Sequence, residues 1–184
     1  LDVLRDLAAY TRDCGEVLLI DEAYAAFAEE VAVPLLREFD NVIITRTFSK
    51  SHALAGMRVG YALGHPRLMA AMKRIRDSFN SYPVDRLAQS AAREAELDTA
   101  YTARIVATIS RDRDVCRQAL ADADIPVLKS RTNFLFVKAA ESDAAPIQQL
   151  LRDDCILVRH FSTPLLRSYL RVTIGTTEDM RIVT

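Results

Sequence analysis

Short apolar runs alternate with helical apolar stripes along the first half of the chain. The runs occupy residues 17–20 (VLLI), 41–48 (NVIITRTF) and 59–63 (VGYAL), and each has the composition of a strand buried on both faces. The stripes occupy residues 1–12 and 66–79, and their apolar residues, three and four apart, are typical of helices packed on one side. This alternation predicts an α/β domain whose mostly parallel sheet is sandwiched by helices.

Longer elements follow in the second half. A helix is predicted over residues 84–97, and Asp98 is a suitable N-cap for a long helix that reaches about Asp122. The pattern then predicts three strands and one helix, the strands at residues 133–138, 156–161 and 169–175 and the helix at 144–152. We therefore expect part of a large domain over residues 1–92 and a small C-terminal α+β domain over residues 93–184.

The balance of charge narrows the range of partners. The chain has 24 Lys and Arg against 25 Asp and Glu, a formal net charge of −1, which argues against a nucleic-acid partner. No apolar run approaches the roughly 18 residues of a membrane span, so we expect no membrane partner. The three cysteines, Cys14, Cys116 and Cys155, lie far apart without metal-ligand spacing. We expect no metal site and a reducing, cytoplasmic location.

One stretch concentrates glycine in a chain that otherwise avoids it. The 184 residues contain five glycines, whereas an average usage of about 7% would give roughly thirteen. Gly56, Gly60 and Gly64 nevertheless stand four apart, shortly after Lys50. We interpret this spacing as a backbone that comes close to an anionic ligand.

Polar side chains gather where the predicted strands end. Asp21 follows the first strand, the second strand leads into Thr47, Ser49 and Lys50, and Arg58 stands eight residues after Lys50. In open α/β sheets, ligands bind outside the carboxyl ends of the strands. If the first two strands are parallel neighbours, these groups converge on one crevice.

Pyridoxal 5′-phosphate is a cofactor that would use all of these groups. Lys50 has the amine for a Schiff base with the cofactor aldehyde. Asp21 can keep the pyridine nitrogen protonated, and Tyr24 can donate to the phenolic oxygen of the ring. Three residues are suited to hold the phosphate: Thr47, Ser49 and Arg58.

Three segments carry a resemblance to a known family. They are LIDEAYAAF (19–27), TRTFSKSHALAGMRVGY (45–61) and ILVRHFSTPLLRSYLRVTIGT (156–176). Together they resemble the fold-type I pyridoxal-phosphate-dependent aminotransferases, and most of all their histidinol-phosphate aminotransferase branch. The resemblance implies the cofactor roles given above, with Lys50 as the catalytic residue. It also implies that Arg171 binds a substrate anion and that Arg159 binds the substrate phosphate.

The resemblance further implies an activity and an assembly. The activity is transamination between a small-molecule amine and a 2-oxo acid, namely histidinol phosphate and 2-oxoglutarate in histidine biosynthesis. The assembly is a homodimer with active sites at its interface. Because family members are considerably longer, we expect this chain to lack an N-terminal part and to be inactive alone.

Other readings stay open from the sequence. An aminotransferase for aromatic or other amino acids, or a pyridoxal-phosphate-dependent decarboxylase of a phosphorylated amino acid, would use the same lysine site. A truncated chain without activity is the non-enzyme alternative. We interpret His52, two residues after Lys50, as a tolerated variation, and the charged run SRDRD at residues 110–114 as a solvated helix face.

Overall fold

The computed structural model of the chain describes residues 1–183. The chain forms two compact units, one spanning Leu1–Ala103 and the other beginning at Arg104. The division falls in the first turns of helix α4 (Thr99–Asp122), eleven residues beyond the expected domain end at residue 92. The side chain of Asp98 accepts a hydrogen bond from the Tyr101 amide at 3.0 Å, as predicted for the N-cap of this helix.

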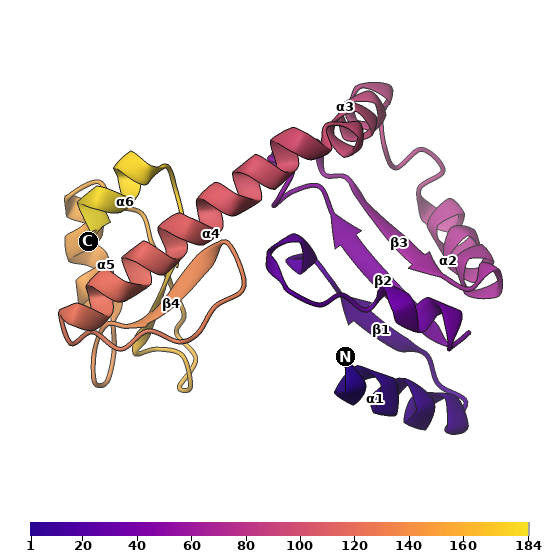
Figure 1. The fold of residues 1–184 in the computed structure, drawn as a ribbon, viewed down its shortest axis with the longest axis horizontal. Coiled ribbons are helices and arrows are strands. Elements are labelled where there is room, and N and C mark those ends of the chain that lie inside the picture. Colours follow the sequence, from indigo (N-terminus) through magenta and orange to yellow (C-terminus); the bar gives the residue numbers. More distant parts are fainter. Residues whose placement is uncertain (184) are drawn as a thin grey trace. The chain divides into compact units, whose positions relative to one another are not determined.

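A three-stranded sheet organises the first unit (Figure 1). Its order is β1 (Leu18–Asp21), β2 (Val42–Thr47) and β3 (Gly60–Gly64). The first two strands are parallel, as predicted, and Asp21 pairs in register with Thr45. β3 is antiparallel to β2. The segment between β2 and β3 contains only a 3₁₀ turn, so it lacks the helical crossover that a parallel neighbour requires.

The core of this unit lies on one face of the sheet. Helix α1 (Asp2–Asp13) and the 3₁₀ helix η2 (Val33–Arg37) cover that face, and they bury Ala8 and Leu35 against Val42 and Ile44 of β2. The buried and partly buried members of this core include Leu4, Ala8, Leu18, Ile20, Leu35, Val42, Ile44 and Leu63. The opposite face is open at β1, where Leu19 is 61% exposed. The prediction of burial on both faces is therefore wrong for β1.

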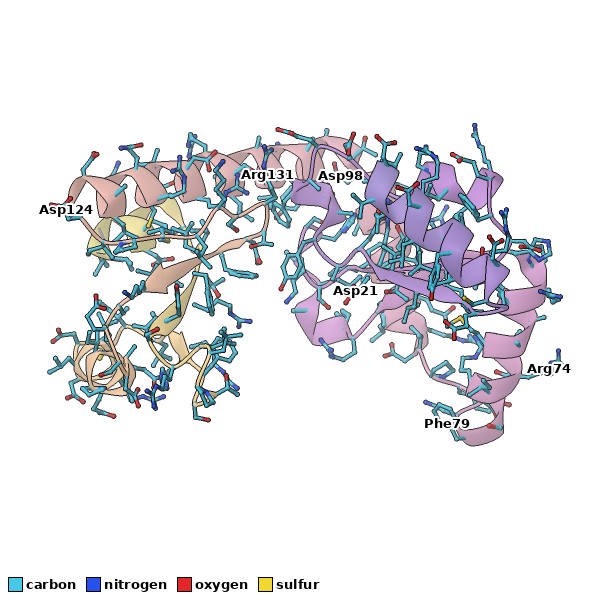
Figure 2. All side chains as sticks on the ribbon, turned by 90° about the horizontal axis from the view of Figure 1, so that it is seen from below. Asp21, Arg74, Phe79, Asp98, Asp124 and Arg131 are labelled. Atoms are coloured by element: carbon cyan, nitrogen blue, oxygen red, sulfur yellow. The ribbon has the colours of Figure 1, made fainter. Side chains whose placement is uncertain are left out.

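Helix α2 (Pro66–Phe79) forms where the sequence pattern predicts it, but it contains no buried residue. Its apolar stripe is exposed, from 38% at Met72 to 65% at Ile75 and 78% at Phe79. Figure 2 shows Phe79 at the far end of the helix. The part of the predicted stripe from Met72 to Phe79 is therefore exposed in the described part of the chain, whereas Leu68, nearer the start of the helix, is partly buried.

Asp85 is the N-cap of helix α3 (Arg86–Leu97), and its side chain accepts a hydrogen bond from the Ala88 amide at 2.9 Å. Ala88 and Ala92 are buried in a small cluster with Phe48 and Val59. Their short side chains allow α3 to approach the loop that follows β2.

The second unit is a small antiparallel α+β unit, in agreement with the prediction. Its sheet has the order β4 (Phe134–Lys138), β6 (Tyr169–Thr173) and β5 (Arg159–His160). β5 is shorter than the predicted strand at 156–161. One face of the sheet packs on an apolar core from α4, β4, β6 and the chain that follows them, including Cys116, Leu120, Leu135, Val137, Val172, Ile174 and Met180.

Helix α5 (Ala145–Asp153) is present as predicted, whereas α6 (Thr177–Val183) was not predicted. Part of the charged run on α4 is not a solvated face, because α6 contacts Asp112 and the segment before β4 contacts Arg113. Asp112 and Arg113 are each only 5% exposed. Asp112 accepts a hydrogen bond from the Thr177 hydroxyl at 2.7 Å, and Arg113 Nη1 donates to the Thr132 carbonyl at 3.1 Å.

The described residues show neither a membrane helix nor a metal cluster. No helix among residues 1–183 combines the length and the apolar character that crossing a membrane would require. Within the same range, no three or more His, Cys, Asp or Glu side chains lie together as metal ligands would.

Candidate active site

A cavity of about 420 Å³ lies at the ends of β1 and β2. Five of the six residues predicted to bind the cofactor line it: Asp21, Thr47, Ser49, Lys50 and Arg58. The sixth, Tyr24, belongs to the turn after β1, before the 3₁₀ helix η1 (Ala25–Phe27). All six belong to the first unit.

The parallel strand pair places these side chains together. β1 ends at Asp21 and β2 ends at Thr47, at the same edge of the sheet. Figure 2 labels Asp21 within this unit. Arg58 ends the 3₁₀ helix η3 (Ala55–Met57) in a left-handed conformation with φ 56°. This conformation turns the chain back into β3, so that Arg58 lines the cavity that also contains Lys50.

The Lys50 amine lies against an aromatic ring. Its Nζ atom is 5.6 Å from the centroid of the Tyr24 ring, a cation–π contact. Within the described part of the chain, no carboxylate or carbonyl hydrogen-bonds this amine. Asp21, in the same cavity, accepts a hydrogen bond from the Ala23 amide at 3.0 Å. The site thus presents an amine and a carboxylate that are not paired with each other.

The hydroxyl and guanidinium groups form a possible anion cradle. The Ser49 amide donates to Thr47 Oγ1 at 3.1 Å, which fixes the turn after β2. Arg58 donates from Nη1 to the Ala55 carbonyl at 2.8 Å. Since a guanidinium has five N–H donors, most of those of Arg58 remain for an anion. The arrangement supplies charge-assisted donors beside the lysine.

Arg46 also lines the cavity, but a carboxylate holds it. Its Nη2 atom lies 2.7 Å from Glu22 Oε2, so this guanidinium is already paired with a carboxylate. Burial alone would lower the pKa of Arg46, but hydrogen bonds with Glu22 and Tyr61 outweigh burial and raise it. The other oxygen of Glu22 accepts a hydrogen bond from the Ala32 amide. Glu22, directly after Asp21, thus ties the end of β1 to Arg46 of β2.

Strand pairing requires two of the three glycines that stand four apart. A Cβ atom at Gly60 would lie 2.7 Å from the Arg46 carbonyl oxygen, and one at Gly64 would lie 3.0 Å from the Val42 carbonyl oxygen. A Cβ atom at Gly56 would meet nothing within 4 Å. Gly60 and Gly64 therefore permit the close pairing of β2 and β3, and Gly60 also lines the cavity that contains Lys50.

The two predicted substrate arginines lie opposite each other in the second unit. Arg159 of β5 pairs in register with Arg171 of β6. Each guanidinium lies over a ring, that of Arg159 5.6 Å from the Phe161 centroid and that of Arg171 5.4 Å from the Phe134 centroid. The Nε atom of Arg171 is buried and has no hydrogen-bond partner. Like charges directly opposite on a sheet repel, and a buried donor without a partner is costly. An anion bound by both arginines would reduce the repulsion and give the Nε atom of Arg171 a partner.

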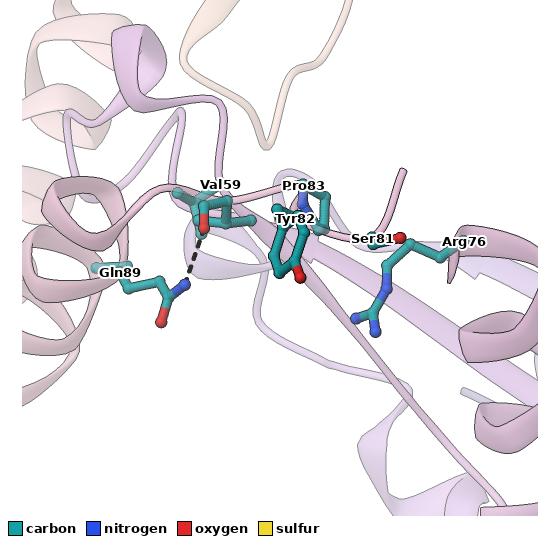
Figure 3. A pocket seen from close by; sticks show the side chains of 8 residues that line it. Val59, Arg76, Ser81, Tyr82, Pro83 and Gln89 are labelled. Atoms are coloured by element: carbon teal, nitrogen blue, oxygen red, sulfur yellow. Dashed lines mark hydrogen bonds between the residues drawn. The ribbon is translucent and has the colours of Figure 1, made fainter. Parts of the chain in front are cut away.

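A second depression of the first unit has a volume of about 480 Å³ (Figure 3). Residues 81–84 and helix α3 contribute to its lining, and Gln89 Nε2 donates to the Val84 carbonyl at 2.8 Å. Tyr82 at its rim is 93% exposed. No predicted site residue lines this depression.

The fold and the site first define a class. In proteins of this class, an amine, a carboxylate and a guanidinium meet in a cavity at the carboxyl ends of parallel strands. A small α+β unit follows along the chain, and it has two arginines paired in register on neighbouring strands. The model of the family described as aminotransferase class I and II matches residues 1–184. The chain belongs to this family, and the predicted fold-type I architecture is confirmed.

Histidinol-phosphate aminotransferases are among the similar proteins. That of Gluconacetobacter diazotrophicus is 48% identical over 168 residues, which cover 91% of this chain and 47% of the relative. Histidinol-phosphate aminotransferase 2 of Dechloromonas aromatica is 40% identical over 184 residues, which are 100% of this chain and 51% of the relative. This chain spans about half the length of these curated relatives.

A solved structure shows the same fold. The histidinol-phosphate aminotransferase from Sinorhizobium meliloti, in complex with pyridoxal-5′-phosphate, aligns with a TM-score of 0.80 and 31% identity. The alignment covers 91% of this chain and 46% of that one.

Proposed function

We propose that the protein containing this chain is a pyridoxal-phosphate-dependent aminotransferase that transfers the amine of histidinol phosphate to 2-oxoglutarate. The observation that carries the proposal is the cavity in which Asp21, Lys50 and Arg58 meet. The family supports the reaction class, and the relatives named histidinol-phosphate aminotransferase, at 40% and 48% identity, support the substrate.

The chemistry of the cavity fits the cofactor. Pyridoxal phosphate combines an aldehyde, a basic ring nitrogen, a phenolic oxygen and a phosphate. Lys50 supplies an amine for the aldehyde, and Asp21 supplies an anion for the protonated ring nitrogen. Tyr24, whose ring contacts the Lys50 amine, would donate to the phenolic oxygen. The phosphate would be held by Thr47, Ser49 and Arg58, which line the same cavity.

The cofactor, when bound, would supply a ring that accepts electrons from the reacting carbon of the substrate. The chain's own residues would do the remaining work. The Lys50 amine would hold the cofactor covalently and, once released, would carry a proton from the amine-bearing carbon of the substrate. Asp21 would stabilise the positive charge on the ring nitrogen throughout.

Arg159 and Arg171 would bind the anionic end of the substrates. Two arginines that are paired in register on neighbouring strands suit a phosphate, which accepts several charge-assisted hydrogen bonds. The same groups can receive a carboxylate of the oxo acid. The free Nε atom of Arg171 provides a donor for either anion.

We further propose a homodimer in the cytoplasm. The open face of β1 at Leu19 and the uncovered stripe of α2 at Ile75 and Phe79 support contact with further protein surface. All three cysteines are free, which is typical of proteins in a reducing compartment.

The test is a labelling and turnover experiment on the full-length protein. The protein should show the absorption band of lysine-bound pyridoxal phosphate, and borohydride reduction should attach the cofactor to Lys50. Incubation with histidinol phosphate and 2-oxoglutarate should form glutamate. Attachment at Lys73 or Lys129 would refute the site assignment. Release of carbon dioxide without an oxo acid would indicate a decarboxylase instead.

A further inference from the structure

The loop that carries Lys50 has little regular backbone support. Between Phe48 and Leu54 the chain closes a turn in which the Leu54 amide donates to the Phe48 carbonyl at 3.1 Å. The Lys50 carbonyl accepts only a long hydrogen bond of 3.4 Å, from the Ala53 amide. Ala53 has φ 56°, a left-handed conformation that is unfavourable for a residue with a Cβ atom. Side-chain contacts must therefore hold this turn in place.

His52 makes three such contacts. Its Nδ1 atom lies 3.1 Å from the hydroxyl of Ser51, the residue directly after Lys50. Its Nε2 atom lies 3.7 Å from Glu96 Oε2 on helix α3. Its ring centroid lies 4.9 Å from that of Phe48, in a tilted arrangement. The His52 side chain is only 16% exposed, so these contacts form in a largely enclosed place.

The chemistry of the imidazole satisfies both polar contacts at once. A neutral ring with its proton on Nε2 accepts the Ser51 hydroxyl at Nδ1 and turns an N–H toward Glu96. Ser51 is 5% exposed, and its hydroxyl would lose this partner if the ring were removed. An unpaired buried hydroxyl is costly, so the turn would shift to satisfy it.

Helix α3 provides a rigid anchor for the other end of the contact. Ala88, Ala92 and Glu96 stand four apart and therefore share one face of the helix. The two alanines are buried against Phe48 and Val59. Glu96 extends this face by one turn and reaches His52.

We propose that His52 is a positioning residue, which joins the Lys50 loop to helix α3 and holds the lysine backbone in the geometry required for proton transfer. This inference rests on the proposed function, because it concerns the same lysine. It replaces the interpretation of His52 as a tolerated variation. His52 touches neither substrate nor cofactor in this proposal and acts through the backbone between residues 50 and 52.

The test compares three variants of the full-length protein loaded with pyridoxal phosphate. His52→Phe keeps a ring against Phe48 but removes both polar contacts. Because a misplacement of about 1 Å can cost around 100-fold in rate, we expect its kcat to fall roughly ten- to 100-fold. The KM and the cofactor absorption band should change little. His52→Asn, whose side chain can again accept from Ser51, should recover most of the rate. The matched control is His65→Phe, which removes the exposed cap of helix α2 and should leave kcat unchanged.

The outcomes separate the proposals. A wild-type protein without cofactor on Lys50 would refute the proposed function before any variant is measured. A wild type with linked cofactor, together with a His52→Phe variant of normal kcat and reduced thermal stability, would show a structural role only and overturn the positioning role. If His52→Phe does not fold, Glu96→Ala serves in its place, because Glu96 is exposed. A fall of about threefold or more in kcat would support the contact, and an unchanged kcat would overturn it.

Discussion

The two units of the chain display their charged site residues in opposite ways. In the first unit, Asp21, Lys50 and Arg58 stand at strand ends and in loops, and they line a cavity together. In the second unit, Arg159 and Arg171 stand inside antiparallel strands, directly opposite each other on one sheet. The first arrangement mixes charges of both signs, whereas the second brings two positive charges together.

The difference indicates what each unit is suited to bind. Groups of both signs on neighbouring loops suit a ligand with several different functional groups, such as the proposed cofactor. Two arginines at paired positions on neighbouring strands suit a single anion. The unpartnered Nε atom of Arg171 adds to the cost of leaving this site without an anion. We therefore expect substitutions in the first unit to affect chemistry and those in the second to affect substrate choice.

The largest effect should follow the loss of Lys50. Lys50→Ala removes the amine that would both hold the cofactor and carry the proton, so we expect no covalent linkage and essentially no turnover. Arg58 should still allow weak, reversible binding of the cofactor. Absorption spectra and borohydride labelling measure the linkage. Lys73→Ala, on the outer part of helix α2, is the matched control and should behave like the wild type.

The next effect should follow Asp21→Asn. This change keeps the side-chain shape but removes the anion beside the ring nitrogen, so turnover should fall by about 10²–10³-fold, as for the loss of other preorganised electrostatic partners. The fold should survive, because Asp21 makes only a local contact with the Ala23 amide. Single-turnover rates and thermal melting measure the two properties. A normal rate would mean that Asp21 only caps the turn after β1.

Arg159→Ala tests whether the second unit determines the choice of substrate. A hydrogen bond to a charged group contributes about 1.5–3 kcal/mol, and about 1.4 kcal/mol is a factor of ten. We expect kcat/KM for histidinol phosphate to fall roughly ten- to 150-fold, with a much smaller loss for an unphosphorylated amine. Arg171→Ala should weaken both half-reactions, because either substrate anion would use that group.

These specificity constants should be measured at fixed ionic strength, since the contact is electrostatic. Arg167→Ala, in the exposed segment between the two arginine strands, is the control and should alter neither substrate. Equal losses for both amines with Arg159→Ala would assign the residue a structural role. The aminotransferase for aromatic amino acids would then be the better reading.

The smallest expected effect concerns stability alone. Burial raises the pKa of Asp112, but hydrogen bonds from Arg111 and Thr177 outweigh burial and lower it. The contribution of a carboxylate with a lowered pKa is present above the pKa of the unfolded state, about 4, and is lost as the pH falls through the folded value. Asp112→Asn should therefore destabilise the protein by about 1–3 kcal/mol at neutral pH.

The measurement for Asp112 is denaturant unfolding across a pH series. The difference in unfolding free energy between wild type and variant should shrink steadily below about pH 4. Asp122→Asn is the control, because this exposed residue of the same helix keeps an oxygen that accepts from Gln118, and it should change stability by less than about 0.5 kcal/mol. A difference between wild type and Asp112→Asn that is independent of pH would show that the charge of Asp112 does not matter.

Much of this protein is determined by local sequence. Periodic apolar spacing identified helices α1 to α5 and the strands, because each pattern matches the repeat of its own element. The meeting of the candidate site residues in one cavity was predictable because they follow strands, and parallel strands bring their ends to one edge. Helix α6 was missed, since a helix of seven residues has too few positions to show a period.

Other features were decided only by tertiary structure. The antiparallel direction of β3, the burial of Asp112 and Arg113, and the cause of the glycine spacing depend on which segments meet, and none of them leaves a local pattern. The contact between His52 and Glu96 also depends on tertiary structure, because the two residues are 44 positions apart in the sequence. Local sequence specifies which conformation a segment prefers, whereas packing between distant segments specifies which polar groups find partners.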